Sequence, residues 1–222
     1  MPPESHATIG ILCALPEELG TLRDRAVGRP LLVQGLEIHE LDVGGRRALA
    51  IVSGIGKVAA ARASTLLVEH GARAGLLVVG TCGGLTRGLV PGTLVHCTRA
   101  AQVDLAVRAG REIDSDPKLL AAWLAVAPGR EGRFLTADRP VVDPFRRLRL
   151  ARAHPGSCVA DMETAAAACV ARAAGVPWAA LRAVTDGGGF ATAAVFARHY
   201  PTQSGRAADT VPALLASIRS PC

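Results

Sequence analysis

The sequence predicts an α/β fold: a single domain over residues 1–222, with a mixed, mainly parallel β-sheet and helices on both of its faces. Thr8–Leu15 is a continuous apolar run, which is typical of a strand buried on both faces, and Gly75–Val79 and Val176–Val184 are predicted to be further strands. Segments of helical composition separate these runs, and this alternation favours a parallel sheet. With 222 residues, 50% of them hydrophobic, the chain is long enough to bury one sizeable core.

The N-terminal part of the chain supplies a helix start, a hairpin and a glycine turn after the first strand. Pro16 is predicted to open a helix, because proline is tolerated at the first helical position. Glu37–Val43 and Arg47–Val52 alternate around a Gly-Gly pair, which predicts a β-hairpin. Ser53-Gly54-Ile55-Gly56-Lys57 then leads into a predicted helix over Val58–His70, and such a turn suits an anion or a polar ligand.

The remainder of the chain continues the alternation of strands and helices. Gly75–Val79 runs into Gly80-Thr81-Cys82-Gly83-Gly84, a turn whose glycines allow backbone N–H groups to approach a ligand. The charged stretch Thr98–Asp116 is predicted to be irregular, the arginine-rich helix Arg146–Ala153 to be solvated, and Gly187-Gly188-Gly189 to form a mobile exit. The other predicted elements are strands at Leu94–Cys97 and Arg133–Thr136, and helices at Pro117–Val126, Ala165–Cys169, Thr192–His199 and Arg206–Arg219, while Ser157–Ala160 leads to the acidic start of the helix at Ala165.

Composition and charge argue against several classes of protein. The formal net charge is +6, but the basic residues are scattered and aromatic residues make up only 3%, so no nucleic-acid partner is expected. No apolar run reaches the roughly 18–20 residues of a membrane-spanning helix, and Met1–Ala7 lacks the layout of a secretion signal. The 6 cysteines show no C-x-x-C spacing, which predicts reduced structural thiols. We therefore expect a cytoplasmic protein without a membrane partner.

Five polar or glycine residues follow the predicted strands closely. In α/β sheets ligands bind at the carboxyl ends of the strands, so these residues are expected to converge there. They are Glu18, Gly54, Thr81, Glu163 and Asp186. An acid such as Glu163 at a helix start is, by itself, equally well explained by the partial positive charge of the helix N-terminus. Together, three carboxylates and a hydroxyl, without a histidine, a cofactor fingerprint or metal-ligand spacing, suit acid–base chemistry at a sugar. The sequence thus predicts neither a cofactor nor a metal.

Four ordered motifs carry a resemblance to a known family. They are Ser53-Gly54-Ile55-Gly56-Lys57-Val58, Val79-Gly80-Thr81-Cys82-Gly83-Gly84-Leu85, Asp161-Met162-Glu163-Thr164 and Arg182-Ala183-Val184-Thr185-Asp186. In this order and spacing, over nearly the whole chain, they resemble the purine nucleoside phosphorylase/hydrolase superfamily, and within it the 5′-methylthioadenosine/S-adenosylhomocysteine nucleosidases. The resemblance implies a homodimeric enzyme that hydrolyses the N-glycosidic bond of a 5′-modified purine nucleoside and releases adenine.

The resemblance also implies a role for each site residue. Asp186 would protonate the purine at N7, and Glu18 would activate the attacking water. Thr81 and Arg182 would help to place that water, while Glu163 would bind the ribose hydroxyls. The other implied contacts are Met162 beneath the sugar, Val141, Thr185 and Phe196 around the base, and Leu15 and Ile55 in the 5′ pocket.

Two alternatives remain open at this point. A phosphate-dependent purine nucleoside phosphorylase of the same fold needs cations for its dianion, but Val78 precedes the glycine turn and Glu18 would repel phosphate. Gly80-Thr81-Cys82-Gly83 nevertheless resembles the phosphorylase version of this turn. The second alternative is a nucleoside-binding protein without catalysis, which would not need Glu18, Glu163 and Asp186 together.

The chain departs from the family pattern in two places. Pro140 stands where the relatives carry an aromatic residue that stacks on the purine, and Phe196 falls at the place of their second aromatic residue. The segment Gln102–Asp116, which shapes the 5′ pocket in relatives, is short and charged. The resemblance therefore leaves the 5′ substituent open. Asp161 is assigned to the helix start or to a supporting position behind the ribose site.

Overall fold

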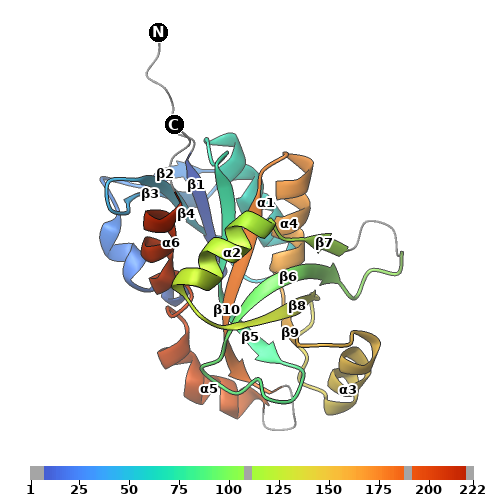
Figure 1. The fold of residues 1–222 in the computed structure, drawn as a ribbon. Coiled ribbons are helices and arrows are strands. Elements are labelled where there is room, and N and C mark those ends of the chain that lie inside the picture. The colour runs from blue at the N-terminus through green and yellow to red at the C-terminus, as the bar shows by residue number, and fades with distance from the viewer. Residues whose placement is uncertain (1–7, 108–111, 188–191, 219–222) are drawn as a thin grey trace.

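The computed structural model describes residues 8–107, 112–187 and 192–218, and within them ten strands form one sheet (Figure 1). The strands are β1 (Ile9–Cys13), β2 (Leu31–Val33), β3 (Leu36–Asp42), β4 (Arg47–Val52), β5 (Gly75–Gly84), β6 (Leu94–Gln102), β7 (Glu112–Asp114), β8 (Arg130–Thr136), β9 (Cys158–Asp161) and β10 (Trp178–Asp186). Parallel pairing joins β4, β1, β5 and β10, and also β6, β8 and β9. The β3–β4 hairpin is antiparallel, as predicted, and β2 extends it.

Helices cover both faces of this sheet, which confirms the predicted mixed α/β fold (Figure 1). The helices are α1 (Lys57–Glu69), α2 (Pro117–Val126), α3 (Pro144–Ala153), α4 (Thr164–Ala173), α5 (Thr192–Gln203) and α6 (Val211–Ser217), with 3-10 helices η1 (Pro16–Arg25) and η2 (Ala208–Thr210). α1 and α4 pack together on one face, whereas η1, α2 and α6 share a core on the other. No described helix has the length and apolarity that crossing a membrane requires.

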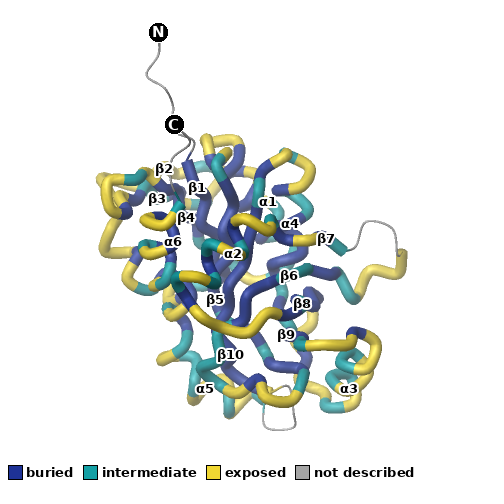
Figure 2. The backbone as a smooth tube through the Cα atoms, in the orientation of Figure 1, coloured by how far each residue is buried: buried dark blue, intermediate teal, exposed yellow. Residues whose placement is uncertain are grey.

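The first strand shows why its apolar run is unbroken. Leu12 packs into the core beneath α1 and α4, whereas Ile11 and Cys13 pack into the core beneath η1, α2 and α6. Successive side chains of a strand point to opposite faces, so a strand with helices on both sides needs apolar residues at every position. Figure 2 shows the buried strands at the centre of the molecule and the exposed loops around them.

Part of the sheet closes on itself. β5 pairs with β10 in parallel and with β9 antiparallel, while β6 pairs with both β8 and β10. Since β8 also pairs with β9, the strands β5, β9, β8, β6 and β10 form a closed ring. β5 and β10 point towards the end of the molecule where α3 and α5 lie (Figure 1). The ring brings the carboxyl end of β9 close to those of β5 and β10.

The prediction of an irregular stretch over Thr98–Asp116 is wrong for much of its length. β6 continues to Gln102 and β7 pairs with it antiparallel, although residues 108–111 lie outside the described ranges. Arg99 lies opposite Asp114 and forms ion pairs with Asp114 (Nε–Oδ1 2.5 Å) and Glu112 (Nη1–Oε2 3.4 Å). Charged residues on neighbouring strands pair across the sheet, so charge alone was a poor sign of a loop.

The helix predicted at Pro16 is a 3-10 helix with a break at Gly20, whose φ of 51° is left-handed. Glycine is needed at this break, because a Cβ placed on Gly20 would also lie 2.8 Å from the carbonyl oxygen of Gly205, far along the chain. The C-terminal helix is shorter than predicted, and Arg219 lies outside the described residues. Gly188 and Gly189 of the predicted mobile exit also lie outside them.

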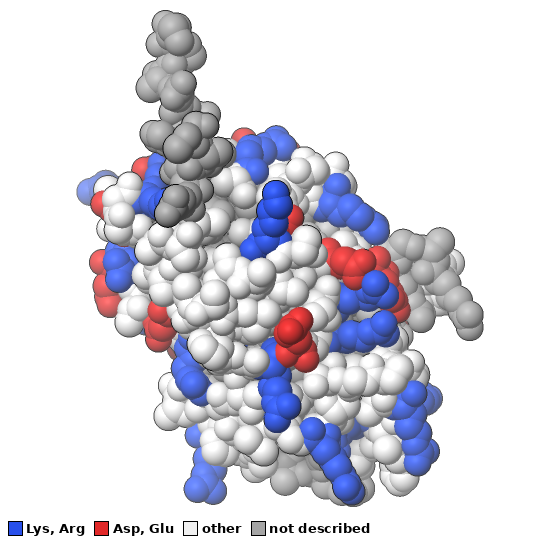
Figure 3. Space-filling view, viewed as in Figure 1, with Lys and Arg blue, Asp and Glu red and all other residues white. Residues whose placement is uncertain are grey.

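The basic residues on the face shown in Figure 3 lie in several separate places. On the face shown in Figure 3, Lys and Arg side chains stand apart from one another and several have acidic neighbours. Helix α3, predicted to be a solvated arginine-rich helix, has no buried residue. The net charge of +6 is therefore not concentrated in one patch on this face.

Candidate active site

A pocket of about 400 Å³ opens where β1, β5, β9 and β10 end, and this volume suits a small-molecule ligand. Every residue that the sequence assigned to the site lines it, although these residues come from distant parts of the chain. They are Leu15, Glu18, Ile55, Thr81, Val141, Met162, Glu163, Arg182, Thr185, Asp186 and Phe196. Of the five residues expected to meet at this edge of the sheet, the pocket lining includes Glu18, Thr81, Glu163 and Asp186 but not Gly54.

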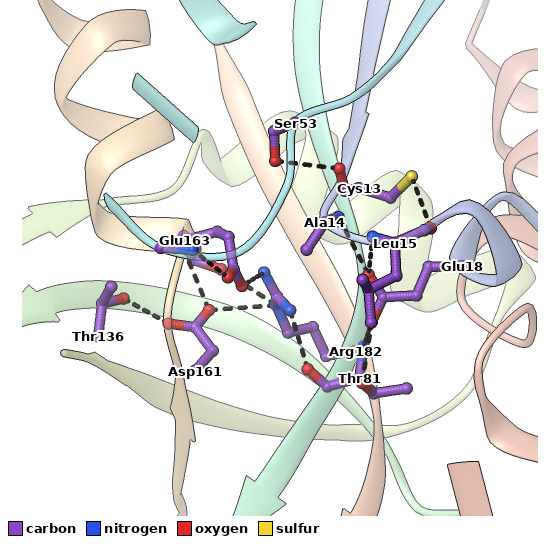
Figure 4. A network of polar contacts seen from close by, with 12 residues as sticks. Cys13, Ala14, Leu15, Glu18, Ser53, Thr81, Thr136, Asp161, Glu163 and Arg182 are labelled. Carbon is purple, nitrogen blue, oxygen red and sulfur yellow. Dashed lines mark hydrogen bonds and ion pairs between the residues drawn. The ribbon is translucent and has the colours of Figure 1, made fainter. Parts of the chain in front are cut away.

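The carboxylate of Glu18 is buried on one side of the pocket and is held by four donors (Figure 4). Its Oε2 accepts the backbone N–H groups of Ala14 (3.0 Å) and Leu15 (3.2 Å). Its Oε1 accepts both the backbone N–H (2.9 Å) and the hydroxyl (2.9 Å) of Thr81. Three of these donors are fixed by the backbone. The Thr81 hydroxyl can rotate, and it is therefore the donor that can release a lone pair of Glu18 to a water molecule.

Gly80 makes room for this carboxylate. A Cβ at Gly80 would lie 2.7–2.8 Å from the carboxyl atoms of Glu18, and the φ of Gly80 is +143°. We expect Gly80→Ala to displace Glu18 and to lower kcat about 10- to 100-fold, because small shifts of a catalytic group have effects of this size. Steady-state kinetics of the purified variant measure this effect.

The control for Gly80 is Gly88→Ala, because Gly88 also has a positive φ (+84°) but a Cβ placed on it would meet nothing within 4 Å. This variant carries the strain of an alanine in a left-handed conformation without the clash. Equal kcat values for Gly80→Ala and Gly88→Ala would show that contact with Glu18 is not what requires glycine at position 80.

Arg182 is the centre of a buried network of polar contacts, with only 2% of its surface exposed (Figure 4). Its Nη1 donates to the carbonyl oxygen of Thr81 (2.8 Å), and its Nη2 to Oε2 of Glu163 (3.0 Å). Its Nε lies 3.1 Å from Oδ2 of Asp161 and 3.2 Å from Oγ1 of Thr164. Burial alone would lower the pKa of Arg182, but the neighbouring carboxylates raise it above its usual value, so the guanidinium stays charged.

Glu163 directly precedes α4, where the sequence predicted it, and both of its oxygens are held. Oε1 accepts the backbone N–H of Gly56 (3.0 Å), and Oε2 accepts from Arg182. Burial raises the pKa of Glu163, an effect that Arg182 opposes and Asp161 reinforces. Because a carboxylate has about four acceptor positions, Glu163 retains capacity for the hydroxyls of a sugar.

Thr185 and Asp186 both line the pocket, although consecutive residues of a regular strand point to opposite faces. A β-bulge between Val184 and Asp186 explains this, because a bulge re-aims the side chains that follow it. Thr185 Oγ1 lies 3.0 Å from Oδ2 of Asp186 and 3.2 Å from the carbonyl oxygen of Cys82. A Cβ on Gly83 would lie 3.2 Å from Oδ1 of Asp186, so glycine lets this carboxylate lie against β5.

The remaining walls of the pocket are mainly apolar. Val141 is buried, whereas Ile55 (57%) and Phe196 (36%) are exposed at the rim. The ring of Phe196 stacks on Tyr200, with a centroid distance of 4.9 Å and an interplanar angle of 30°. Pro140, the departure from the family pattern, also lines the pocket.

Asp161 supports the site, as the sequence assigned it to do. Its Oδ1 accepts the hydroxyl of Thr136 (2.5 Å), and its Oδ2 faces Arg182 and the backbone N–H of Thr164. The sequence did not identify Thr136, Thr164, Gly56 or Gly80 as parts of the site. Most of their contacts join residues remote in sequence, and only the motifs that contain Gly56, Gly80 and Thr164 offered a signal. No group of three or more His, Cys, Asp and Glu side chains in the described residues is arranged to hold a metal ion.

This fold and this site define an α/β protein of the nucleoside phosphorylase-like class. The family model described as "Phosphorylase superfamily" matches residues 8–216. The chain belongs to the phosphorylase superfamily.

Individual relatives match almost the whole chain. The 5′-methylthioadenosine/S-adenosylhomocysteine nucleosidase of Actinobacillus succinogenes is 28% identical, over 95% of this chain and 99% of that protein. The enzyme of the same name from Geobacillus kaustophilus is 28% identical, over 94% of this chain and 97% of that protein.

Solved structures share the fold. The Neisseria meningitidis 5′-methylthioadenosine/S-adenosylhomocysteine nucleosidase in complex with methylthio-immucillin-A has a TM-score of 0.90 at 23% identity, with coverage of 96% of this chain and 100% of that chain. The futalosine hydrolase of Helicobacter pylori has a TM-score of 0.89 at 21% identity, with coverage of 95% and 98%.

Proposed function

We propose that the chain is a nucleosidase that hydrolyses the N-glycosidic bond of a 5′-modified purine nucleoside, similar to methylthioadenosine or S-adenosylhomocysteine, and releases adenine. The strongest support is the placement of the carboxylates of Glu18 and Asp186, which both lie against β5. Glu18 is bound to Thr81, and Asp186 lies against Gly83, two residues further along the strand. These backbone positions are about 7 Å apart along the strand, so the two carboxylates lie at different points of the same pocket, as the separate roles of an acid and a base require.

The proposed reaction divides the work between the two sides of the pocket. Asp186 donates its proton to N7 of the purine while the C1′–N9 bond breaks, and the electron pair of that bond passes to the base. Water then bonds to C1′ and gives a proton to Glu18. The Thr81 hydroxyl turns from Glu18 to the water, and Glu163 binds the ribose hydroxyls. The carboxylates near the sugar stabilise the positive charge that develops on it.

The charge of the pocket favours water over phosphate as the nucleophile. Arg182 is the only cation among the described residues that line the pocket, and its Nε, Nη1 and Nη2 already donate to protein acceptors. A phosphate dianion would instead approach the carboxylates of Glu18 and Glu163 at short range. This observation supports the hydrolase over the phosphorylase alternative.

A panel of 5′-substituted adenosines tests the proposal, with release of adenine measured in the presence and in the absence of phosphate. We expect adenine release at the same rate in both, and the panel identifies the preferred 5′ substituent. A strict requirement for phosphate would establish the phosphorylase instead. Binding of the nucleosides without base release would establish a binding protein.

We further propose that the enzyme is a homodimer whose partner covers the rim of the pocket. Ile55 lines that rim, and nearby in the chain Val58, at the start of α1, is 83% exposed. Exposed apolar side chains beside a site are typical of a surface that another protein covers. Light scattering should give twice the 22.9 kDa mass of the chain.

We also propose that the enzyme acts in the cytoplasm. All described cysteines are free thiols, as is usual in a reducing compartment: Cys13, Cys82, Cys97, Cys158 and Cys169.

A further inference from the structure

Lys57, the first residue of α1, links the segment that follows β6 to the segment that follows β8, beside the pocket. Its Nζ lies 2.6 Å from Oδ1 of Asp104 and 3.2 Å from Oδ2 of Asp138, and its side chain is only 17% exposed. The backbone N–H of Asp138 donates to Oδ2 of Asp104 (2.9 Å), so the two acidic residues also contact each other directly. The lining of the pocket includes none of these three residues, and the proposed reaction does not use them.

The ammonium group of Lys57 neutralises the two carboxylates of this cluster. Burial would lower the pKa of Lys57, but its hydrogen bonds with Asp104 and Asp138 raise it. Burial would likewise raise the pKa of Asp104, but Lys57 and the N–H of Asp138 lower it. Lys57 and Asp104 are therefore both charged near neutral pH. Without the cation, the two carboxylates would face each other and their repulsion would separate the loops.

The backbone of Lys57 connects this cluster to the ribose site. Lys57 is the first residue of α1, and its N–H donates to Oδ1 of Asp138 (3.1 Å). The preceding N–H, of Gly56, donates to Oε1 of Glu163 (3.0 Å). A helix N-terminus has backbone N–H groups without partners in the helix, and here two carboxylates from other elements accept consecutive ones.

The same cluster connects to the base side of the pocket. Asp138 is two residues before Pro140 and three before Val141, and both of these line the pocket. The side chain of Asp138 is 54% exposed, and its contacts with Lys57 and Asp104 fasten this otherwise solvated residue to the cluster. The position of the loop 138–142, the base loop, relative to Glu163 thus depends on Lys57.

We propose that Lys57 is a positioning residue that holds the base loop at a fixed distance from the ribose-binding carboxylate Glu163. This inference rests on the proposed nucleosidase function. A nucleoside must meet the base loop and Glu163 at the same time, whereas free adenine needs only the base side. Loss of Lys57 therefore weakens binding of the intact nucleoside more than binding of the free base.

The test is Lys57→Met, which keeps an unbranched apolar stem and removes the charge. We expect KM for the preferred nucleoside to rise about 10-fold while kcat changes less than about 3-fold, the pattern of lost binding rather than lost catalysis. The dissociation constant of adenine, measured by calorimetry, should change less than about 3-fold. A wild-type KM in folded Lys57→Met, or equal losses for nucleoside and adenine, overturns the inference.

Three further variants separate the loss of the Lys57 charge from a general effect of substitution. Lys118→Met removes the other lysine of the chain, which is exposed on α2, and should behave as wild type. Lys57→Arg keeps the charge and should retain most of the nucleoside affinity. Asp104→Asn weakens the cluster without touching the pocket, so it should raise KM in the same direction. If Lys57→Met does not fold, Asp104→Asn decides, and a wild-type KM there also overturns the inference.

The proposed function and this inference fail in different ways. If the wild-type enzyme releases no base from any nucleoside, the proposed function is wrong. The positioning role is then measured by the dissociation constants of nucleoside and adenine alone, with the same expected difference between them. If the wild-type enzyme is active and the variants match it, only the positioning role is wrong.

Discussion

Asp186→Asn should lower kcat about 10³-fold while nucleoside binding changes little. General acid catalysis contributes roughly 10²–10⁴-fold to a rate, and an amide cannot supply the proton that the leaving purine needs. The geometry should survive the change, because the Asn oxygen can still accept from Thr185 Oγ1, which lies 3.0 Å from Oδ2 of Asp186. Single-turnover kinetics and a separate binding titration measure the two quantities.

Asp24→Asn provides the control for this substitution. Asp24 is an exposed residue of η1 and does not line the pocket, so the same change of carboxylate to amide should leave kcat unaltered. Retention of more than about a tenth of wild-type kcat in Asp186→Asn would assign the proton to another donor. A parallel loss of binding would mean that Asp186 mainly holds the substrate.

Glu18→Gln should also lower kcat for hydrolysis about 10³-fold, which corresponds to about 4 kcal/mol of transition-state stabilisation. A glutamine side chain cannot take the proton of the attacking water. It also fits the site poorly, because Glu18 accepts four hydrogen bonds and the amide NH₂ of glutamine accepts none. If that NH₂ faces Thr81, the hydroxyl can turn to accept it, but the Thr81 N–H loses its partner. This costs about 1–3 kcal/mol of folding stability, which thermal unfolding measures.

Glu17→Gln is the matched control, since Glu17 is the preceding residue of the same helix. It is exposed and outside the pocket lining, and its Oε2 accepts the hydroxyl of Tyr200 (3.2 Å). We expect wild-type kcat from this variant. The phosphorylase alternative predicts the opposite result at position 18, because removal of a negative charge there would help a phosphate dianion to bind. Phosphate-dependent turnover that persists or rises in Glu18→Gln would therefore contradict the hydrolase.

The long-range contacts of the site explain why several of its features were not predictable. The bulge at Thr185 depends on the pairing of β10 with β5, and the need for glycine at position 80 depends on the carboxylate of Glu18. The two aspartates around Lys57 come from segments for which the sequence predicted an irregular stretch or a part of the base site. Apart from the motif that contains Gly80, none of these contacts leaves a periodic or local signal in the chain.

The sequence by itself determined the alternation of strands and helices, the burial of β1 and β5, and the place of Glu18, Thr81, Glu163 and Asp186 at one edge of the sheet. It could do so because burial on both faces requires unbroken apolar runs, and because the ends of parallel strands meet at one edge of a sheet. Only the tertiary structure decided that five strands close into a ring, that Asp161 pairs with Arg182, and that Lys57 links the base loop to Glu163. These contacts arise when distant segments pack together, and their partners are set by geometry that no single segment contains.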